Sequence, residues 1–92
     1  MKAYVYILKD ENNKFYIGST SNLIRRIKQH DHGYTQTTNR MENPVLVFSQ
    51  EYANLKTARW IEQRLKKLKR KDYVEKIISD GYIKMSPSWY NG

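Results

Sequence analysis

Two short runs rich in β-branched and aromatic residues open the chain and leave few folds available to it. Residues 4–8 read Tyr-Val-Tyr-Ile-Leu, and residues 15–18 read Phe-Tyr-Ile-Gly. The segment between the two runs is polar and rich in Asn, which is typical of a turn. The pair therefore predicts an antiparallel β-hairpin.

The alternation of side chains along a strand predicts which residues of this hairpin share a face. A slip of one residue would turn the whole apolar face outward, so the register is restricted. The purely apolar side chains expected on the core face are Val5, Ile7, Phe15 and Ile17. Tyr6 and Tyr16 then share the opposite face, either side of Leu8, if the loop has about three or five residues.

The rest of the sequence predicts one further strand and three helices. We expect strands near residues 4–9, 14–18 and 45–52, and helices near residues 21–31, 55–69 and 71–80. Asp72 is expected to cap the last helix and Gly81 to end it. The side chains expected to be largely buried are Val5, Ile7, Phe15, Ile17, Leu23, Ile27, Val47, Ile61, Leu65 and Leu68.

These elements predict an α/β fold of the α+β type, in which helices flank a small three-stranded antiparallel sheet. The chain has 92 residues, which is the size of one small domain. We therefore expect a single domain over residues 1–92. Residues 81–92 are apolar enough to form a C-terminal tail that docks on the core.

The charge balance favours a polyanionic partner. Seventeen Lys and Arg residues against nine Asp and Glu residues give a net charge of +8. Such a surplus on a small chain attracts nucleic acid first, although an anionic membrane surface or a highly charged protein satisfies the same excess. Composition alone does not decide between these partners.

Several classes of protein are excluded by composition. The chain has no Cys, so disulfide frameworks, thiolate zinc sites and cysteine nucleophiles are ruled out. No apolar run approaches the ~20 residues of a membrane span, and no secretory signal begins the chain. We expect a cytosolic protein that does not insert into membranes.

An ordered set of short motifs runs through most of the chain. The set consists of Tyr4-Val5-Tyr6, Tyr16-Ile17-Gly18, Asn22-Leu23, the pair Arg26 and His30, and Glu62. This order resembles the GIY-YIG nuclease family, and most closely its small stand-alone bacterial branch. The branch is similar to the catalytic domains of an excision-repair nuclease subunit and of homing endonucleases. The resemblance implies the GIY-YIG fold.

The resemblance also implies roles for five residues. By their place in the motifs, the catalytic residues are Tyr6, Tyr16, Arg26, His30 and Glu62, and Glu62 binds the metal. The sequence departs from the family at three positions: Tyr4 replaces a glycine, Ser19 replaces a lysine found in many members, and Ser86 stands where several members have an asparagine.

The residue types suit phosphodiester hydrolysis on their own account. Glu62 can hold one Mg²⁺ or Mn²⁺ ion while water and phosphate oxygens complete the coordination. Arg26 offers a planar, permanently charged fork to a phosphate. Tyr6, Tyr16 and His30 are the candidate bases. A free phenol titrates near pH ~10, so its ionisation at pH 7 costs about 4 kcal/mol unless a nearby cation reduces that cost.

Each of these residues also has a purely structural interpretation. Strand tyrosines commonly pair across a sheet, and His30 suits the C-terminal dipole of its helix. Glu62 and Lys66 stand four apart on a helix, which is the spacing of an ordinary ion pair. Only the joint order of the five positions favours function over these interpretations.

The sequence thus predicts an endonuclease that cuts DNA in repair, recombination or processing. We expect substrate shape or a protein partner to direct it, and we expect a monomer. Contacts to nucleic acid are expected at Gly18, Ser19, Arg25, Lys66, Lys67 and Arg70. Two alternatives remain: a catalytically weak or silent nucleic-acid-binding module, and a small basic protein that supports a larger assembly.

Overall fold

The fold comes from a computed structural model that describes residues 1–31, 43–85 and 87–89, with only the backbone of residues 30 and 31. In chain order, the elements are β1 (Ala3–Lys9), β2 (Phe15–Thr20), α1 (Leu23–Asp31), β3 (Val45–Tyr52), α3 (Leu55–Leu68) and α4 (Lys71–Asp80). The strands form one antiparallel sheet in the order β2-β1-β3. The predicted α+β fold is confirmed.

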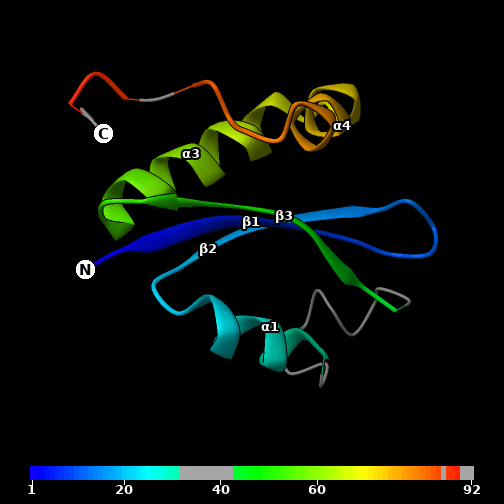
Figure 1. Cartoon of the computed structure of the whole chain (residues 1–92). Helices are drawn as coiled ribbons and strands as arrows, with labels where there is room; N and C mark the ends of the chain where they lie inside the picture. Colours follow the sequence, from blue (N-terminus) through cyan, green and yellow to red (C-terminus); the bar gives the residue numbers. More distant parts are fainter. Residues whose placement is uncertain (32–42, 86, 90–92) are drawn as a thin grey trace.

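Helices cover both faces of this sheet. Helix α1 lies on one face, and α3 and α4 lie on the other (Figure 1). The central strand β1 is therefore buried in both directions: Val5 and Ile7 are buried towards α3, and Tyr6 and Leu8 towards α1. We call these the α3 face and the α1 face of the sheet.

The register of the hairpin agrees with the predicted alternation. Ile7 pairs with Ile17, and Leu8 pairs with Tyr16. Because paired residues point to the same side of an antiparallel sheet, the four apolar side chains of the hairpin share the α3 face. Tyr6 and Tyr16 share the α1 face.

A loop of five residues, 10–14, closes the hairpin, and five is one of the two predicted loop lengths. One carboxylate oxygen of Asp10 accepts hydrogen bonds from the N–H groups of Asn12 and Lys14, at 2.9 and 2.8 Å. Asn13 has a φ of 62°, in the left-handed region that asparagine tolerates better than most residues. The turn is thus held by side-chain hydrogen bonds as well as by the strands.

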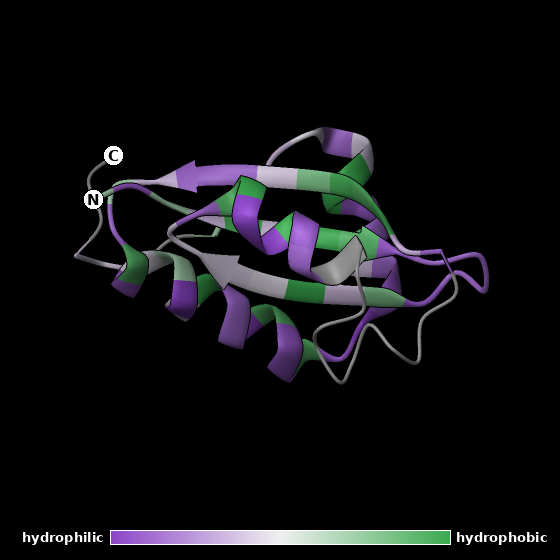
Figure 2. Ribbon diagram, turned by 90° about the horizontal axis from the view of Figure 1, so that it is seen from below, coloured by the Kyte–Doolittle hydropathy of each residue, from purple (hydrophilic) through white to green (hydrophobic). Residues whose placement is uncertain are grey.

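Helix α3 supplies most of the cover on its face. Its buried side chains Ala58, Ile61 and Leu65 lie on the sheet, and Asn54 caps its start by accepting the N–H of Thr57 at 2.8 Å. Figure 2 shows hydrophilic and hydrophobic residues alternating around the helices, as expected where one side packs and the other meets water.

Several predicted details differ from the structure. Leu68 is 43% exposed because it is the last residue of α3, where the chain turns away through Lys69. Asp72 does not cap α4, since it lies inside the helix; the cap position is Arg70, which makes no side-chain cap bond and pairs with Asp72 at 2.7 Å. Four further residues predicted to be buried are only half-buried: Phe15, Leu23, Ile27 and Val47.

The described part of the C-terminal tail lies against β3 and α3. The N–H of Ile83 donates to Oε1 of Gln50 at 2.7 Å, and Ile83 and Pro87 are buried. The Trp89 ring meets the Trp60 ring edge to face, with centroids 6.0 Å apart. Ser86 and residues 90–92 fall outside the described residues. Within the described ranges, no helix is long and apolar enough to cross a membrane.

Candidate active site

The hairpin brings two phenols together on the α1 face. Tyr6 lies at the centre of β1 and is 1% exposed, whereas Tyr16 lies diagonally across from it on β2 and is half-buried. Their ring centroids are 6.2 Å apart with a tilt of 42°. A hydrogen bond joins the two hydroxyl groups. The pairing predicted from the strand period is present.

Gly18 makes room for the Tyr6 ring. The two residues are directly paired across the sheet, and the ring lies over the glycine backbone. A Cβ atom on residue 18 would lie 2.5 Å from Cζ of Tyr6 and closer still to its hydroxyl oxygen. Glycine is therefore required here by close approach, and its role is to position Tyr6.

Arg26 reaches the same region from α1. Asn22 starts this helix: its Oδ1 accepts the N–H of Arg25 at 3.1 Å, and its carbonyl accepts the N–H of Arg26 at 3.1 Å. A polar cavity of about 320 Å³ lies at this helix start, lined in part by Ser21, Arg25 and Arg26. The guanidinium groups of Arg25 and Arg26 at a helix N-terminus suit the oxygens of a phosphate.

Glu62 approaches from α3, on the other side of the sheet. Its Oε1 accepts a short hydrogen bond from the hydroxyl of Ser19, and its Oε2 pairs with Nζ of Lys66 at 2.6 Å. The Glu62 side chain is 18% exposed. Lys66 also lies 5.6 Å from the centre of the Tyr16 ring. The ion pair of Glu62 with Lys66, which the purely structural interpretation predicted, is therefore present. It lies beside Tyr16, a phenol of the candidate site.

The electrostatics of Tyr6 connect these groups. Burial raises the pKa of the Tyr6 phenol above its ordinary value, and Tyr16 and Glu62 raise it further, while the positive charge of Arg26 acts in the opposite direction. A phenol with a raised pKa stays protonated at neutral pH and donates a hydrogen bond. Tyr6 is thus suited to orient its neighbour, which leaves Tyr16 and His30 as candidate bases.

The remaining predicted residues are less closely grouped. His30 lies in α1, but its side chain falls outside the described part of the structure. Lys67 and Arg70 are exposed near the end of α3, and Arg70 is engaged by Asp72. The hydrogen bond from Ser19 to Glu62 was not predicted. The one sequence feature that pointed to Ser19 is that it replaces the lysine found in many members of the family that the sequence resembles.

The donor set beside Glu62 fits one divalent ion. No group of three or more His, Cys, Asp or Glu side chains converges among the described residues. One carboxylate, with the Ser19 hydroxyl bound to it, is sufficient for Mg²⁺, which keeps several waters and takes further ligands from substrate phosphates. It is too little for a two-ion centre.

Comparison with known proteins agrees with this arrangement. The family model described as the GIY-YIG catalytic domain matches residues 2–77 of the sequence. The chain belongs to the GIY-YIG family. The UPF0213 protein CPE1444 of Clostridium perfringens is 39% identical over 77 residues, covering 83% of each chain. The UPF0213 protein YazA of Bacillus subtilis is 32% identical over 76 residues, covering 78% of this chain and 77% of the relative.

A solved structure extends the likeness to the fold. The solution NMR structure of the UPF0213 protein BH0048 from Bacillus halodurans is 29% identical, with a TM-score of 0.56 over 88% of this chain and 87% of that one. GIY-YIG domains make up a nuclease family, and its members are in general dependent on divalent metals. The small-protein branch predicted from the sequence is confirmed by these relatives.

The raised pKa of Tyr6 predicts how this GIY-YIG domain responds to alkali. Tyr6→Phe loses the hydrogen bond to Tyr16 and is expected to be about 1 kcal/mol less stable at pH 7. Above pH ~10, unfolded tyrosines ionise while buried Tyr6 stays protonated, so the parent loses stability as pH rises and the variant is spared this loss. Urea unfolding of both proteins between pH 7 and 11 measures the difference. The difference between their free energies of unfolding should become smaller above pH ~10. A difference that stays constant with pH would contradict the burial of Tyr6 as the cause.

Proposed function

We propose that the chain is a divalent-metal-dependent endonuclease that hydrolyses phosphodiester bonds in DNA. One observation carries the proposal: the hairpin brings the rings of Tyr6 and Tyr16 to 6.2 Å from each other, and Arg26 on α1 and Glu62 on α3 lie near enough for their charges to act on the Tyr6 phenol. The net charge of +8 supplies attraction to the phosphate backbone. Neither cross-strand pairing nor surface charge alone accounts for an arginine and a carboxylate from two different helices acting on this pair of phenols.

Each group has a distinct role in the proposed reaction. Arg26, at the cavity beside the start of α1, binds the phosphate and neutralises charge on its non-bridging oxygens. Tyr16 or His30 accepts the proton of the attacking water, and protonated Tyr6 orients Tyr16 through their hydrogen bond. Glu62 holds one Mg²⁺ or Mn²⁺ ion, which when bound stabilises charge on the phosphate and on the leaving oxygen.

The proposal includes a surface for the nucleic acid. Its members are Ser19, Arg25, Lys66, Lys67 and Arg70. Gly18, which was also predicted to contact nucleic acid, is buried against the Tyr6 ring and is not part of this surface. Phosphate contacts of this kind position a backbone without reading its sequence. Substrate shape or a protein partner then directs cleavage, and a monomeric cytosolic protein acting in repair, recombination or processing of DNA belongs to the same proposal.

A second candidate function rests on the surroundings of Glu62. Both of its carboxylate oxygens are already engaged, one by Ser19 and the other by Lys66. A metal ion must compete with these partners. A nucleic-acid-binding module with weak or no cleavage is the function expected if Lys66 keeps the carboxylate neutralised.

The decisive experiment is a cleavage assay with single-stranded, duplex, flapped and branched DNA and with RNA, in Mg²⁺ or Mn²⁺ and in EDTA. We expect cleavage of DNA only with metal, and a rate that rises with pH towards alkaline values if a phenol is the base. A histidine base would instead reach a plateau near neutrality. Binding without cleavage of any substrate would favour the second candidate.

Tyr16→Phe separates catalysis from binding in the same assay. The change removes only a hydroxyl group, and we expect a rate lower by ~10²-fold or more with DNA binding nearly unchanged. Tyr4→Phe is the matched control, because Tyr4 also carries a strand hydroxyl on the α1 face but donates it to Glu51 at 3.3 Å. Equal rates for the two variants would remove Tyr16 from the reaction.

A further inference from the structure

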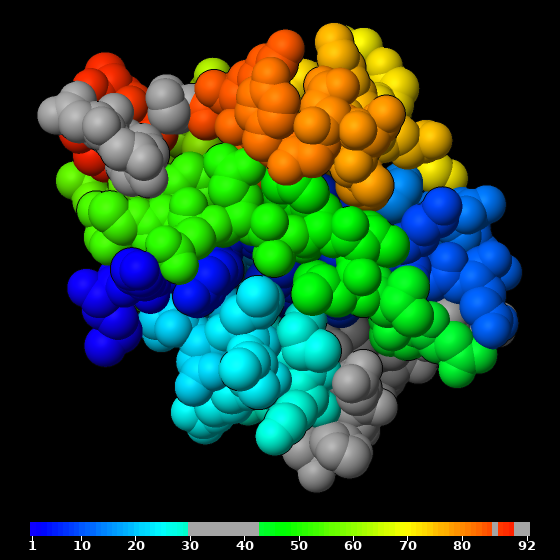
Figure 3. Space-filling model, viewed as in Figure 1, coloured from blue at the N-terminus to red at the C-terminus, as the bar shows by residue number. Residues whose placement is uncertain are grey.

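We propose that a second cavity, formed by the hairpin and the junction of α3 with α4, binds one unpaired nucleotide of the nucleic acid. This inference rests on the proposed function for its choice of partner. The cavity has a volume of about 570 Å³, within the ~300–1,000 Å³ range of small-ligand sites. We call it the hairpin pocket. In Figure 3, residues near 70 lie beside the hairpin loop at one end of the molecule.

The rim of the hairpin pocket is strongly basic. Among the described residues, five cationic side chains and no acidic side chain line it: Lys14, Lys66, Lys69, Arg70 and Lys71. Lys66 and Arg70 have acidic partners, Glu62 and Asp72. The other three have no carboxylate partner among the described residues. Like charges held at one cavity repel one another, and a bound phosphate relieves that repulsion.

The floor of the pocket is apolar and includes an aromatic ring. Phe15, Leu65 and Val74 line it. Phe15 is half-buried, and its ring already attracts two cations, Nζ of Lys71 at 5.7 Å and Nζ of Lys9 at 5.8 Å from the centroid. An aromatic face beside backbone-binding cations is the combination with which proteins hold single-stranded nucleic acid. In a duplex, neighbouring bases cover each base face, so an unpaired nucleotide is the form that this ring can bind.

Lys69 gives an independent reason to assign function to the pocket. It lies in the left-handed conformation, with φ 49° and ψ 36°, at the position that ends α3. Glycine adopts this conformation without steric cost and is the usual residue there. The chain instead keeps a lysine whose backbone is strained and whose side chain lines a cavity. Strain of this kind is commonly retained where the side chain serves a ligand.

The pocket borders the candidate active site at two residues. Tyr16 and Lys66 line it, and both also lie at the Glu62 cluster. A nucleic-acid chain with one phosphate bound at Arg26 would pass Tyr16 and then reach the hairpin pocket. The nucleotide bound there is therefore a near neighbour of the phosphate to be cleaved, and cleavage close to an unpaired nucleotide is favoured.

The test measures binding in EDTA, so it does not depend on cleavage. The probes are a labelled single-stranded DNA of about ten nucleotides and the matching duplex. We expect Phe15→Leu to weaken single-strand binding by about 10-fold and to leave duplex binding nearly unchanged, because the lost contact is stacking. Lys69→Gly should weaken single-strand binding by about 5-fold. It should also raise the thermal midpoint, because glycine relieves the strain, so loss of folding cannot explain the effect.

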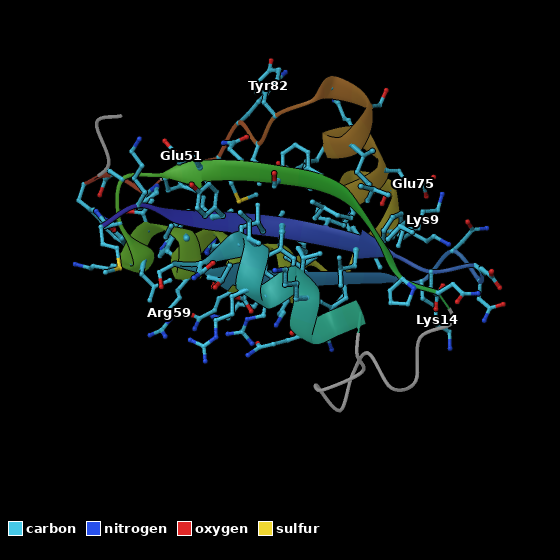
Figure 4. All side chains as sticks on the ribbon, turned by 60° about the horizontal axis from the view of Figure 1, so that its bottom comes forward. Lys9, Lys14, Glu51, Arg59, Glu75 and Tyr82 are labelled. Atoms are coloured by element: carbon cyan, nitrogen blue, oxygen red, sulfur yellow. The ribbon has the colours of Figure 1, made fainter. Side chains whose placement is uncertain are left out.

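Arg59→Ala is the matched control. Arg59 is an exposed cation on α3, and Figure 4 shows it far from Lys14 of the hairpin loop. It should leave the ratio of single-strand to duplex affinity unchanged. Competition by inorganic phosphate as effective as that by a nucleoside monophosphate would reduce the pocket to a general anion site and overturn the proposal. The proposal would also be overturned if Phe15→Leu and Lys69→Gly both left the ratio of single-strand to duplex affinity unchanged.

The outcomes also separate this proposal from the proposed function. A changed affinity ratio in a protein that never cleaves DNA supports the pocket and refutes the nuclease. Metal-dependent cleavage with an unchanged ratio in Phe15→Leu and Lys69→Gly supports the nuclease and refutes the pocket.

Discussion

Glu62→Ala is expected to abolish metal-dependent cleavage, with a fall of about 10³-fold or more in rate, because it removes the carboxylate that would hold the metal ion beside Tyr6 and Tyr16. DNA binding in EDTA should be retained or slightly tightened, because the substitution removes a negative charge and releases Lys66 from its ion pair. Single-turnover cleavage with a saturating amount of enzyme, together with a binding titration, measures the two effects separately.

Glu51→Ala provides a close control for this experiment. Glu51 has the same kinds of partners as Glu62, a hydroxyl from Tyr4 at 3.3 Å and a lysine, Lys2, at 3.4 Å. It lies on β3, on the far side of β1 from β2, as the view with side chains shows (Figure 4). Cleavage should be unaffected. If both variants retained parental activity, Glu62 would be left as one half of an ordinary ion pair.

Gly18→Ala is expected to destabilise the protein by about 2–3 kcal/mol and to disrupt the phenol pair. The added Cβ atom would overlap the Tyr6 ring, and that ring belongs to a side chain that is only 1% exposed. Either the ring or strand β2 must shift, and both changes separate Tyr6 from Tyr16. Urea unfolding gives the loss of stability, and cleavage measured well below the unfolding midpoint gives the loss of function.

Gly81→Ala distinguishes this steric effect from a general intolerance of substitution. Gly81 has a φ of 82°, and a Cβ atom added to it would meet no other atom within 4 Å, so its replacement strains only the backbone. We expect a cost of about 1 kcal/mol and unchanged cleavage by the folded protein. If Gly18→Ala behaved in the same way, the Tyr6 ring would not need the space that glycine leaves.

The sequence was sufficient to predict the hairpin and its register because strand period is a local property. The faces of Val5 and Ile17, and the meeting of Tyr6 with Tyr16, depend only on alternation and loop length. The ends of the helices were less predictable. Leu68 fits the apolar period of α3 but lies where the helix ends, and periodicity carries no information about what packs beyond that end.

The surroundings of the candidate site could not be predicted, since they depend on tertiary packing. The sequence placed Glu62 on a helix, but its contact with Ser19, 43 positions away, follows from how α3 crosses β2. The burial of Tyr6 follows from α1 covering a face that alternation alone leaves undefined. The hairpin pocket combines residues from β2, α3 and α4, and the strain at Lys69 has no signature in composition or spacing.

The division of the candidate site along the chain affects the order in which it is assembled during synthesis. Tyr6, Tyr16 and Arg26 belong to the hairpin and the helix that follows it, whereas Glu62 belongs to α3. Domains are made from the N-terminus, so a nascent chain still lacking α3 carries the phenols and the arginine without the acid. Such a fragment, even while it is held near nucleic acid at the ribosome, has no complete centre with which to cut.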